Sequence, residues 1–387
     1  MKTGGRIAFL QKNFPWSGAE MVTMDVANYL VSQGYEVTIL TPRHHPSSYP
    51  EGKPVLFQVE PLPIGNIKYS RKIAKAVRSF VDSHHIDVLV TYQAMFYASW
   101  LRRKTGVSIV YELHNTPYYE FLDIADKMRE SRAQNLFYRC GVKWLLTRFY
   151  RSKYRNIYAS VDAYAVLCDG YRDQVVSELK LSEYDNKVWV LPNSIAPAST
   201  VEWHKKKTII YAGRLTHRDK RVDRLLRIWQ SVEPHLSGWQ LKLIGSGRAE
   251  PQLRQLAANL HLERCSFEGR TTRMKDYYDE AAILCMTSSF EGWPMVIAEA
   301  QSNGVIPVVF DSYRAARDMI ATPDEGVLVP PFDETVFARE LLALASDEPR
   351  MESMRQCIVR KAATYTIARS GEAWMAMIQT LKRKRQY

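Results

Sequence analysis

The sequence contains no long uninterrupted apolar stretch. A membrane-spanning helix needs roughly 20 consecutive apolar residues, and no hydrophobic run approaches that length. The first residues, Met1–Arg6, lead directly into the apolar run Ile7–Leu10, so we expect no secretory signal peptide. With 46% hydrophobic and 24% charged residues, the chain is expected to be a globular, cytoplasmic protein with a sizeable core.

Cysteine is scarce and forms no pattern. The five cysteines are scattered, and most lie inside apolar runs: Cys140, Cys168, Cys265, Cys285 and Cys357. Because their number is odd and no metal-ligand spacing occurs, we expect reduced core thiols, no disulfide framework and no metal. The Gly-x-Gly-x-x-Gly fingerprint is also missing, since only Gly18 occupies the loop after the first strand, and this disfavours NAD or FAD.

Acidic residues are absent from the segment Arg132–Tyr158, although the whole chain has a net charge of +12. The seven basic residues of this segment are interspersed with aromatic and leucine side chains: Arg132, Arg139, Lys143, Arg148, Arg151, Lys153 and Arg155. Such a helix-compatible segment is typical of contact with an anionic membrane surface, where each cation contributes roughly 1 kcal/mol. The alternative is a solvated helix whose aromatic rings face the protein's own core. Nucleic acid is disfavoured, because no nucleic-acid-binding motif occurs.

Strand-like and helix-like segments alternate in both halves, which predicts parallel sheets covered by helices. A chain of 387 residues suits two domains, and the polar, proline-containing stretch Pro192–Thr200 predicts a linker between them. We therefore expect an α/β fold with two Rossmann-like domains facing a cleft, spanning 1–198 and 199–370, followed by a helix and basic tail at 371–387. The predicted strands are Arg6–Leu10, Tyr35–Thr41, Val55–Val59, Asp87–Thr91, Ser108–Glu112, Ala163–Cys168, Lys187–Leu191, Thr208–Ala212, Gln240–Ile244, Cys265–Glu268, Ile283–Thr287, Ile306–Phe310 and Gly326–Val329.

Two carboxylates, Glu291 and Glu299, lie eight residues apart where a predicted strand passes through a loop into a helix. Pro294 suits the first helical position, which places Glu291 in the loop and Glu299 in the second helical turn. Strand ends followed by helix N-termini bind ligands in open α/β sheets, and their backbone N–H groups favour phosphate. The pair therefore predicts acceptors for sugar hydroxyls beside a diphosphate. The alternative is a solvated loop acid and a surface helix residue.

Other loops carry candidate binding residues. Arg214 and Lys220 follow the first strand of the second half, where they either bind a diphosphate or are simply solvated. Gly245–Gly247 is a weaker signal that a tight turn also explains. Gly18 opens the first helix and allows a ligand to approach, while Ser17 and Glu20 also match a capping box. His114, at a strand end, is either catalytic or a packed hydrogen-bonding group.

Taken together, these residues resemble the retaining GT-B glycosyltransferases of family four, the glycogen-synthase-like group 1 glycosyltransferases. The matching segments follow the expected order along most of the chain: Gly18–Glu20, His114, Pro192–Ile195, Ala212–Lys220, Gly245–Gly247, Phe267–Gly269 and Glu291–Glu299. The segment from Glu291 to Glu299 is the most specific of them. In place of the family's glycine-rich turn after Pro307, this chain has Asp311–Asp318, so the donor sugar is not identified.

The resemblance implies a role for each matching residue. Arg214 and Lys220 would bind the donor diphosphate, with Arg218 as an alternative to Lys220 because the spacing is one residue longer than usual. Glu299 would hold the ribose, and Gly269–Arg273 would flank the base. Glu291 would contact the donor sugar, assisted by the backbone of Gly292, Trp293 and Pro294. Gly18 would add phosphate contacts, and His114 would contact the sugar near its anomeric centre.

The implied activity is hexose transfer with retention of configuration and without a metal. The expected donor is a nucleotide sugar, UDP-hexose, and the expected acceptor is a lipid-linked or cell-surface glycan made at the inner face of the cell membrane. A soluble acceptor, a non-catalytic nucleotide-sugar-binding scaffold and a nucleotide-sugar epimerase are the alternatives. The tail Lys382–Arg385 is either a further membrane contact or solvated.

Overall fold

A computed structural model describes residues 4–15, 18–50, 52–122, 124, 143–182 and 185–386. The chain divides into two compact units. Unit 1 comprises Met1–Ser194 and Ile367–Tyr387, and unit 2 comprises Ile195–Thr366. The boundaries expected from the sequence, after residues 198 and 370, lie close to these divisions. Ser17 of the expected capping box and the first part of the basic segment, including Arg132 and Arg139, lie outside the described residues.

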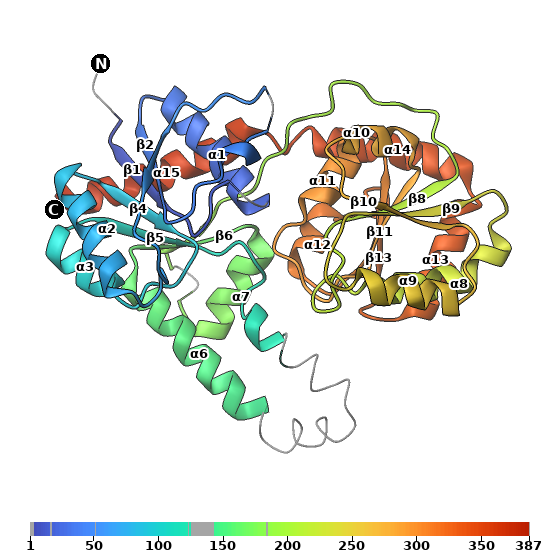
Figure 1. Ribbon diagram of the computed structural model, residues 1–387, viewed down its shortest axis with the longest axis horizontal. Coiled ribbons are helices and arrows are strands. Elements are labelled where there is room, and N and C mark those ends of the chain that lie inside the picture. Colours follow the sequence, from blue (N-terminus) through green and yellow to red (C-terminus); the bar gives the residue numbers. More distant parts are fainter. Residues whose placement is uncertain are drawn as a thin grey trace. The chain divides into compact units, whose positions relative to one another are not determined.

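Unit 1 is built on a seven-stranded parallel sheet with the order β3-β2-β1-β4-β5-β6-β7 (Figure 1). The strands are β1 (Arg6–Leu10), β2 (Glu36–Thr41), β3 (Gln58–Pro61), β4 (Val88–Thr91), β5 (Ser108–Glu112), β6 (Ala163–Val166) and β7 (Val188–Val190). The described helices are α1 (Gly18–Ser32), α2 (Arg71–Ser83), α3 (Ala98–Thr105), α6 (Lys143–Ser160), α7 (Asp169–Leu179) and α15 (Ile367–Gln386), with a short 3₁₀ turn at Pro46–Ser48. Because the central strands are covered by helices, their residues are buried on both faces.

The last helix of the chain belongs to unit 1. α15 packs against α1, and the buried Trp374 ring lies 5.5 Å from the ring of Phe9 in β1. Lys382, near the end of α15, donates a hydrogen bond of 2.8 Å to the carbonyl of Gly4. These contacts confirm the prediction of a C-terminal helix that returns to the first domain, and the helix is longer than the predicted core at Gly371–Leu381.

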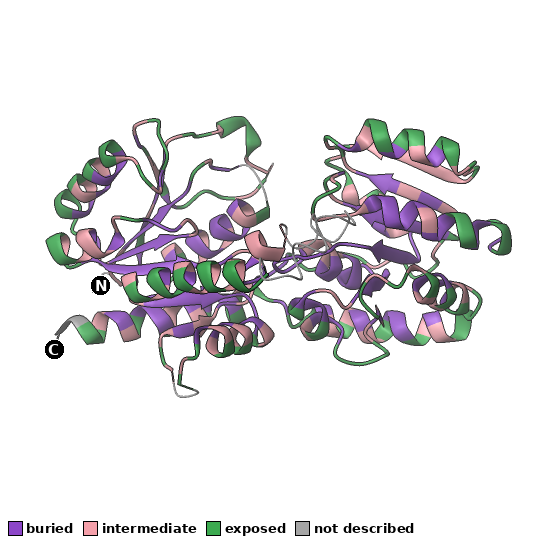
Figure 2. Cartoon of the chain, turned by 90° about the horizontal axis from the view of Figure 1, so that it is seen from below, coloured by how far each residue is buried: buried purple, intermediate pink, exposed green. Residues whose placement is uncertain are grey.

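Unit 2 has a six-stranded parallel sheet with the order β10-β9-β8-β11-β12-β13. Its strands are β8 (Thr208–Ala212), β9 (Gln240–Ile244), β10 (Cys265–Gly269), β11 (Ile283–Met286), β12 (Ile306–Phe310) and β13 (Val327–Val329). Its α-helices are α8 (Val222–Val232), α9 (Glu250–Asn259), α10 (Met274–Glu280), α11 (Met295–Ser302), α12 (Arg314–Met319), α13 (Glu334–Ala345) and α14 (Glu348–Ala362), with a 3₁₀ turn at Glu233–His235. Figure 2 shows the sheets in the buried colour and exposed residues on the outward helix faces.

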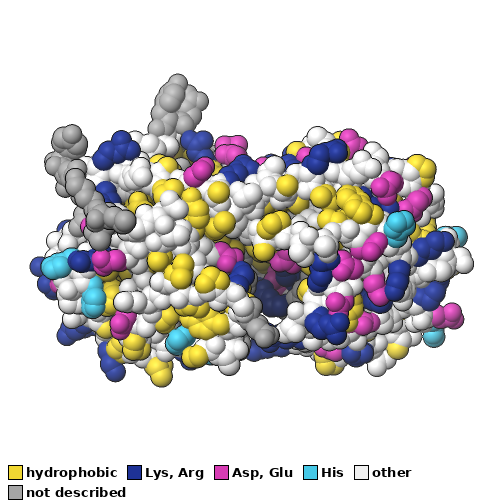
Figure 3. All heavy atoms as spheres, turned by 90° about the horizontal axis from the view of Figure 1, so that it is seen from above, with side chains coloured by type: hydrophobic (Ala, Val, Ile, Leu, Met, Phe, Trp, Pro, Cys, Tyr) yellow, Lys and Arg dark blue, Asp and Glu magenta, His cyan; other side chains and the backbone are white. Residues whose placement is uncertain are grey.

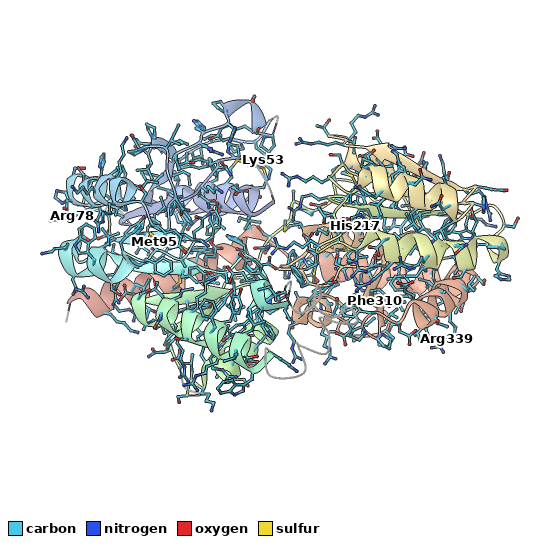
Figure 4. All side chains as sticks on the ribbon, turned by 60° about the horizontal axis from the view of Figure 1, so that its bottom comes forward. Lys53, Arg78, Met95, His217, Phe310 and Arg339 are labelled. Carbon is cyan, nitrogen blue, oxygen red and sulfur yellow. The ribbon has the colours of Figure 1, made fainter. Side chains whose placement is uncertain are left out.

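The core of unit 2 lies between this sheet and its helices. Val222, Leu225 and Trp229 of α8 are almost fully buried, as their helical spacing predicts. Phe310, labelled in Figure 4, ends β12 and meets the ring of Phe337 edge-on at 5.0 Å. The predicted pair of parallel α/β units is therefore confirmed.

One predicted strand is misplaced. The apolar pattern at Val55–Val59 predicts a strand there, but β3 begins only at Gln58. Pairing with β2 starts at Gln58, which lies opposite Thr38. Val55 and Leu56 therefore lie outside the sheet and are 43% and 53% exposed. Pairing with a neighbouring strand, rather than local hydrophobicity, decides where this edge strand begins.

Candidate functional site

The candidate residues of unit 2 lie in loops that follow the carboxyl ends of adjacent parallel strands. Arg214 and Lys220 follow β8, and Glu291 follows β11, which pairs directly with β8. In an open α/β sheet this edge is where ligands bind. The loops are joined there, because the Ser289 N–H donates to the carbonyl of Asp219 at 2.8 Å. The hydroxyl of Ser312, after β12, donates to the carbonyl of Ser288 at 2.7 Å.

Lys220 and Glu291 form a buried ion pair at this edge. The Lys220 Nζ lies 2.6 Å from Glu291 Oε1, and the two side chains are only 15% and 10% exposed. Ser288 donates a second hydrogen bond of 2.7 Å to the same carboxylate oxygen. A buried charge requires such partners, since desolvation without compensation costs several kcal/mol per ion. Lys220 is therefore a cation directed at Glu291, and the alternative role of Arg218 stays a prediction.

Arg214 is held differently. Its side chain is 73% exposed, and Nη2 lies 3.0 Å from Asp219 Oδ2. Asp219 also accepts a short hydrogen bond from the Thr216 hydroxyl. Burial raises the pKa of Asp219, but the Thr216 hydrogen bond and the charges of Lys220 and Arg214 outweigh it, so its pKa lies below the usual value. The carboxylate thus stays ionised and orients Arg214 toward solvent-accessible space. His217 of the same loop, labelled in Figure 4, is exposed as well.

The Gly245–Gly247 turn supports the Arg214 loop. A Cβ on Gly245 would lie 1.9 Å from the carbonyl oxygen of Gly213, and one on Gly247 would lie 2.1 Å from that of Leu215. The two backbones are also joined by a hydrogen bond from Leu215 N to the Ser246 carbonyl at 3.0 Å. Only glycine allows this approach. The turn therefore places the loop that carries Arg214 and Lys220.

Glu299 lies in the second turn of α11, as predicted. The Tyr278 hydroxyl donates to Glu299 Oε2 at 2.8 Å. Pro294 is the residue immediately before the helix rather than its first residue, a difference of one position that is common at helix ends. Gly292 is buried, and the Trp293 ring packs edge-on against Tyr365 at 5.2 Å, so Trp293 stabilises the turn that precedes α11.

A second group of polar residues lies at the carboxyl edge of the unit 1 sheet. His114 follows β5, and its Nε2 lies 3.2 Å from Oε2 of Glu112, the last residue of that strand. The ring of Tyr92, after β4, meets the His114 ring edge-on at 6.1 Å. Glu20 of α1 is buried and acts on the charge of His114. Gly18 is the first residue of α1, and no atom of the described residues lies within 4 Å of the position of a Cβ there.

The described part of the basic segment forms α6, which extends from unit 1 in Figure 1. Its second half faces the core, since Tyr154 and Ile157 are buried. Its first half does not, because Trp144, Leu145 and Phe149 are 62%, 59% and 63% exposed. Exposed Lys143 and Arg148 lie among them, and Arg148 lies 5.6 Å from the centre of the Trp144 ring. The second half of the helix therefore fits the alternative in which the aromatic rings face the core, and membrane contact of the first half stays a prediction.

Several residues of these clusters carry no sequence signal. Ser288, Asp219 and Tyr278 contact their partners across 3 to 21 positions of sequence, and nothing local distinguishes them from solvated residues. Glu112 is different, because a glutamate inside an otherwise apolar strand, two residues before a histidine, is a detectable pattern. No group of three or more His, Cys, Asp or Glu that could hold a metal ion occurs among the described residues.

Two protein-family models match the chain. Residues 16–199 match the model described as Glycosyltransferase Family 4. Residues 195–361 match the model described as Glycosyl transferases group 1. Together the two matches extend from α1 to α14.

Individual proteins are similar over most of the chain. An uncharacterized glycosyltransferase of Haemophilus influenzae is 25% identical over 351 residues, which cover 87% of this chain and 91% of that protein. The GalNAc-alpha-(1->4)-GalNAc-alpha-(1->3)-diNAcBac-PP-undecaprenol alpha-1,4-N-acetyl-D-galactosaminyltransferase of Campylobacter jejuni is 25% identical over 243 residues, or 62% of this chain and 66% of that enzyme. The crystal structure of Anabaena HepE in complex with UDP and glucose shares the fold, with a TM-score of 0.74, 15% identity and coverage of 97% and 99% of the two chains.

Proposed function

Because this chain belongs to the group 1 glycosyltransferases, we propose that it transfers a hexose from a nucleotide sugar to a lipid-linked or cell-surface glycan with retention of anomeric configuration. UDP is the proposed nucleotide of the donor. HepE, which has the same fold, was crystallised with UDP and glucose. The name of the C. jejuni relative includes an undecaprenol-linked glycan.

The observation that carries the proposal is the arrangement of cations and carboxylates at the carboxyl edge of the unit 2 sheet. Lys220 is paired with Glu291, and Arg214 is paired with Asp219. As the glycosidic bond of a nucleotide sugar breaks, negative charge accumulates on the diphosphate, and fixed cations lower the barrier. A bound diphosphate would compete with the carboxylates for both cations, and Glu291 is proposed to lie beside the donor sugar.

Glu299 is proposed to hold the ribose of the donor. The Tyr278 hydroxyl orients its carboxylate at 2.8 Å, and an ionised carboxylate has about four acceptor sites, so it can accept ribose hydroxyls as well. Gly269–Arg273, the loop after β10, is proposed to flank the base. The backbone N–H groups of Gly292 and Trp293 are proposed to contact the sugar. Gly18 of unit 1 is proposed to lie near phosphate, and His114 near the anomeric centre.

In the proposed reaction the acceptor hydroxyl oxygen attacks the anomeric carbon from the face that the diphosphate leaves. The bond from that carbon to the diphosphate oxygen breaks, and the diphosphate takes both bonding electrons and the acceptor proton. Arg214 and Lys220 stabilise the leaving group in the role that a metal has in other transferases, so we propose that the reaction needs no metal. Glu291 and Glu299 position the donor and do not act as an acid–base pair.

A lipid-linked acceptor requires access to a membrane. None of the helices in the described part of the chain is long and apolar enough to span a bilayer. The exposed Trp144, Leu145 and Phe149 of α6, with two neighbouring cations, are proposed to rest on the anionic inner face of the cell membrane. An exposed aromatic and basic helix surface of this kind binds at the lipid headgroups.

The first experiment measures donor hydrolysis and transfer with a panel of UDP- and GDP-sugars, with and without EDTA. Wild type is compared with Glu299→Ala and with Glu340→Ala, a control on α13 that removes a carboxylate paired with Arg339. We expect turnover of one donor, unaffected by EDTA, reduced in Glu299→Ala by about 10- to 100-fold and unchanged in Glu340→Ala. Absence of donor binding across the panel would contradict the proposed activity.

The stereochemistry and the acceptor are tested separately. NMR of the product formed from an α-linked donor is expected to show an α-glycoside, and a β-glycoside would contradict retention. An extract of undecaprenol-linked glycans is compared with the same glycans released from the lipid. Equal transfer to both would favour a soluble acceptor.

A further inference from the structure

Glu112 is a buried carboxylate that the proposed reaction does not use. It ends β5, a central strand of the unit 1 sheet, and its residue is only 3% exposed. Placing a carboxylate in the core of a sheet is costly unless a cation or hydrogen-bond donors compensate for its lost hydration. An uncharged alanine or valine would be easier to bury in this strand. The buried charge of Glu112 therefore acts on the residues that contact it.

The neighbour in closest contact is His114. The two residues are separated by one position, and because side chains alternate along an extended strand, both point to the same side. His114 Nε2 lies 3.2 Å from Glu112 Oε2, with the side chains 11% and 4% exposed. The contact is a close ion-pair contact, since Nε2 makes no hydrogen bond in this ring orientation. Both side chains are largely shielded from water by the surrounding protein. This strengthens the electrostatic interaction between the two groups.

The titratable groups that act on His114 come from three elements. Glu112 lies on β5, the buried Glu20 lies on α1, and the Tyr92 ring follows β4. Tyr92 is an uncharged phenol at neutral pH, since burial raises its pKa to about 12. Burial of the imidazole lowers the pKa of His114, but the carboxylates of Glu112 and Glu20 raise it by more, so the net pKa lies above its ordinary value.

We propose that Glu112 is a positioning residue for His114: its buried carboxylate holds the imidazole ring through the close contact at Nε2. In the protonated ring Nε2–H faces Glu112 and Nδ1–H is presented to a ligand. A neutral imidazole would offer only one donor. The proposal rests on the proposed function for the identity of the ligand, a hydroxyl oxygen of the donor sugar.

A protonated ring beside the anomeric centre binds the sugar as a donor and cannot act as a base. His114 therefore contributes to donor positioning in this interpretation, and the proton of the acceptor hydroxyl goes to the leaving diphosphate as proposed above. Loss of the Glu112 charge would convert the ring to the neutral form as the pH rises.

The direct test is a ¹⁵N NMR titration of the histidine side chains in the full-length protein between pH 5 and 9. The His114 signals are assigned by their absence in His114→Gln. We expect His114 of wild type to lose its proton above the ordinary histidine value of about 6.5, and at a lower pH in Glu112→Gln. Titration of wild-type His114 at or below that value, or no change in Glu112→Gln, would overturn the proposal.

A kinetic test separates positioning from a general loss of structure. In Glu112→Gln we expect kcat/KM for the donor to fall by about 10- to 100-fold, the range for losing an interaction with a charged group, with a larger loss at pH 8.5 than at pH 6. The control Glu178→Gln removes the carboxylate paired with Arg151 in the same unit and is expected to leave the pH profile unchanged. A uniform loss at all pH values would indicate only a structural role and overturn the proposal.

The NMR titration needs no substrate, so the two hypotheses fail separately. A raised and Glu112-dependent titration in a protein that turns over no sugar donor would support the charged ring and overturn the proposed transferase activity. Transfer activity in a protein whose His114 pKa is not raised would support the proposed transferase activity and overturn the charged ring. Glu112→Asp, which keeps the charge on a shorter side chain, is expected to restore the high titration point more fully than the catalytic rate.

Discussion

At the scale of single residues, the two cations proposed to bind the diphosphate differ in burial. Arg214 is 73% exposed and pairs with Asp219, whereas Lys220 is 15% exposed and pairs with the equally buried Glu291. Exposed ion pairs contribute about 0 to 1 kcal/mol to stability. Removing one partner of a buried pair leaves an uncompensated charge and costs several kcal/mol.

This difference predicts separate effects of Arg214→Ala and Lys220→Met. Both are expected to reduce kcat by about 100- to 1,000-fold, in the range of lost transition-state donors. Arg214→Ala is expected to change the free energy of unfolding by less than about 1 kcal/mol, and Lys220→Met to lower it by about 3 kcal/mol. Urea denaturation and donor turnover measure the two effects.

The double variant Lys220→Met with Glu291→Gln is the control for the buried pair. It removes both charges, so it is expected to recover part of the stability lost in Lys220→Met without recovering activity. Equal stability of the single and double variants would show that the pair does not matter for folding.

The charge of His114 predicts a pH-dependent stability. Because its pKa is raised in the folded protein, protonation favours the folded state. This contribution is complete below the ordinary histidine pKa of about 6.5 and is lost as the pH rises through the higher folded pKa. We expect wild type to exceed His114→Gln in unfolding free energy by more at pH 6 than at pH 9, measured by urea denaturation. A larger excess at pH 9 would contradict the sign of the shift.

At the scale of elements, the packing of α15 on α1 depends on one glycine. A Cβ on Gly371 would lie 2.1 Å from ring carbons of Tyr29 in α1. Glycine in a helix interior normally weakens the helix by about 1 kcal/mol relative to alanine, so its presence here is explained by close approach of the two helices and not by local preference.

Gly371→Ala is therefore expected to destabilise the protein by about 1 to 3 kcal/mol, the usual cost of overpacking, although alanine is the better helix former. Glu372→Ala, at the exposed neighbouring position, is the matched control and is expected to change stability by less than about 0.5 kcal/mol. Thermal unfolding of both variants measures the effect. A more stable Gly371→Ala would show that the helices separate easily.

Most elements could be predicted from local pattern, and the exceptions have physical reasons. The buried strands β5 and β12 coincide with their predicted ranges, because continuous apolar runs between turns leave no other register. β3 was wrong at its start, since an edge strand begins where its neighbour can pair. The predicted helix Gly371–Leu381 is too short, and the turn after Leu381 is held by a hydrogen bond from Lys382 to Gly4, far away in sequence.

At the scale of the whole molecule, the net charge of +12 is not gathered on the face drawn in Figure 3, where basic and acidic side chains are interspersed. The first half of α6 instead combines exposed cations with Trp144, Leu145 and Phe149. If this surface docks on a membrane, binding depends both on anionic lipid and on these apolar side chains.

We expect the protein to float with vesicles containing phosphatidylglycerol at low salt and to be released as salt screens the charges. The triple variant Trp144→Ser, Leu145→Ser, Phe149→Ser is expected to bind at least about tenfold more weakly, since each apolar side chain contributes about 1 kcal/mol or more. Trp203→Ser, at an exposed tryptophan of unit 2, is the control. Equal flotation of both variants would contradict docking through α6.

The sequence by itself determined the alternation of strands and helices, the two α/β units and the loops that carry Arg214, Lys220, Glu291, Glu299 and His114. These features follow from local periodicity and from the rule that loops after parallel strands meet at one edge. Only the tertiary structure decided that Lys220 faces Glu291 across 71 positions, that Tyr278 orients Glu299 and that Glu112 lies buried against His114. Ion pairs and hydrogen bonds require distances of a few ångström. The number of residues between two side chains does not specify such a distance, which is fixed only when the sheet brings the strand ends together.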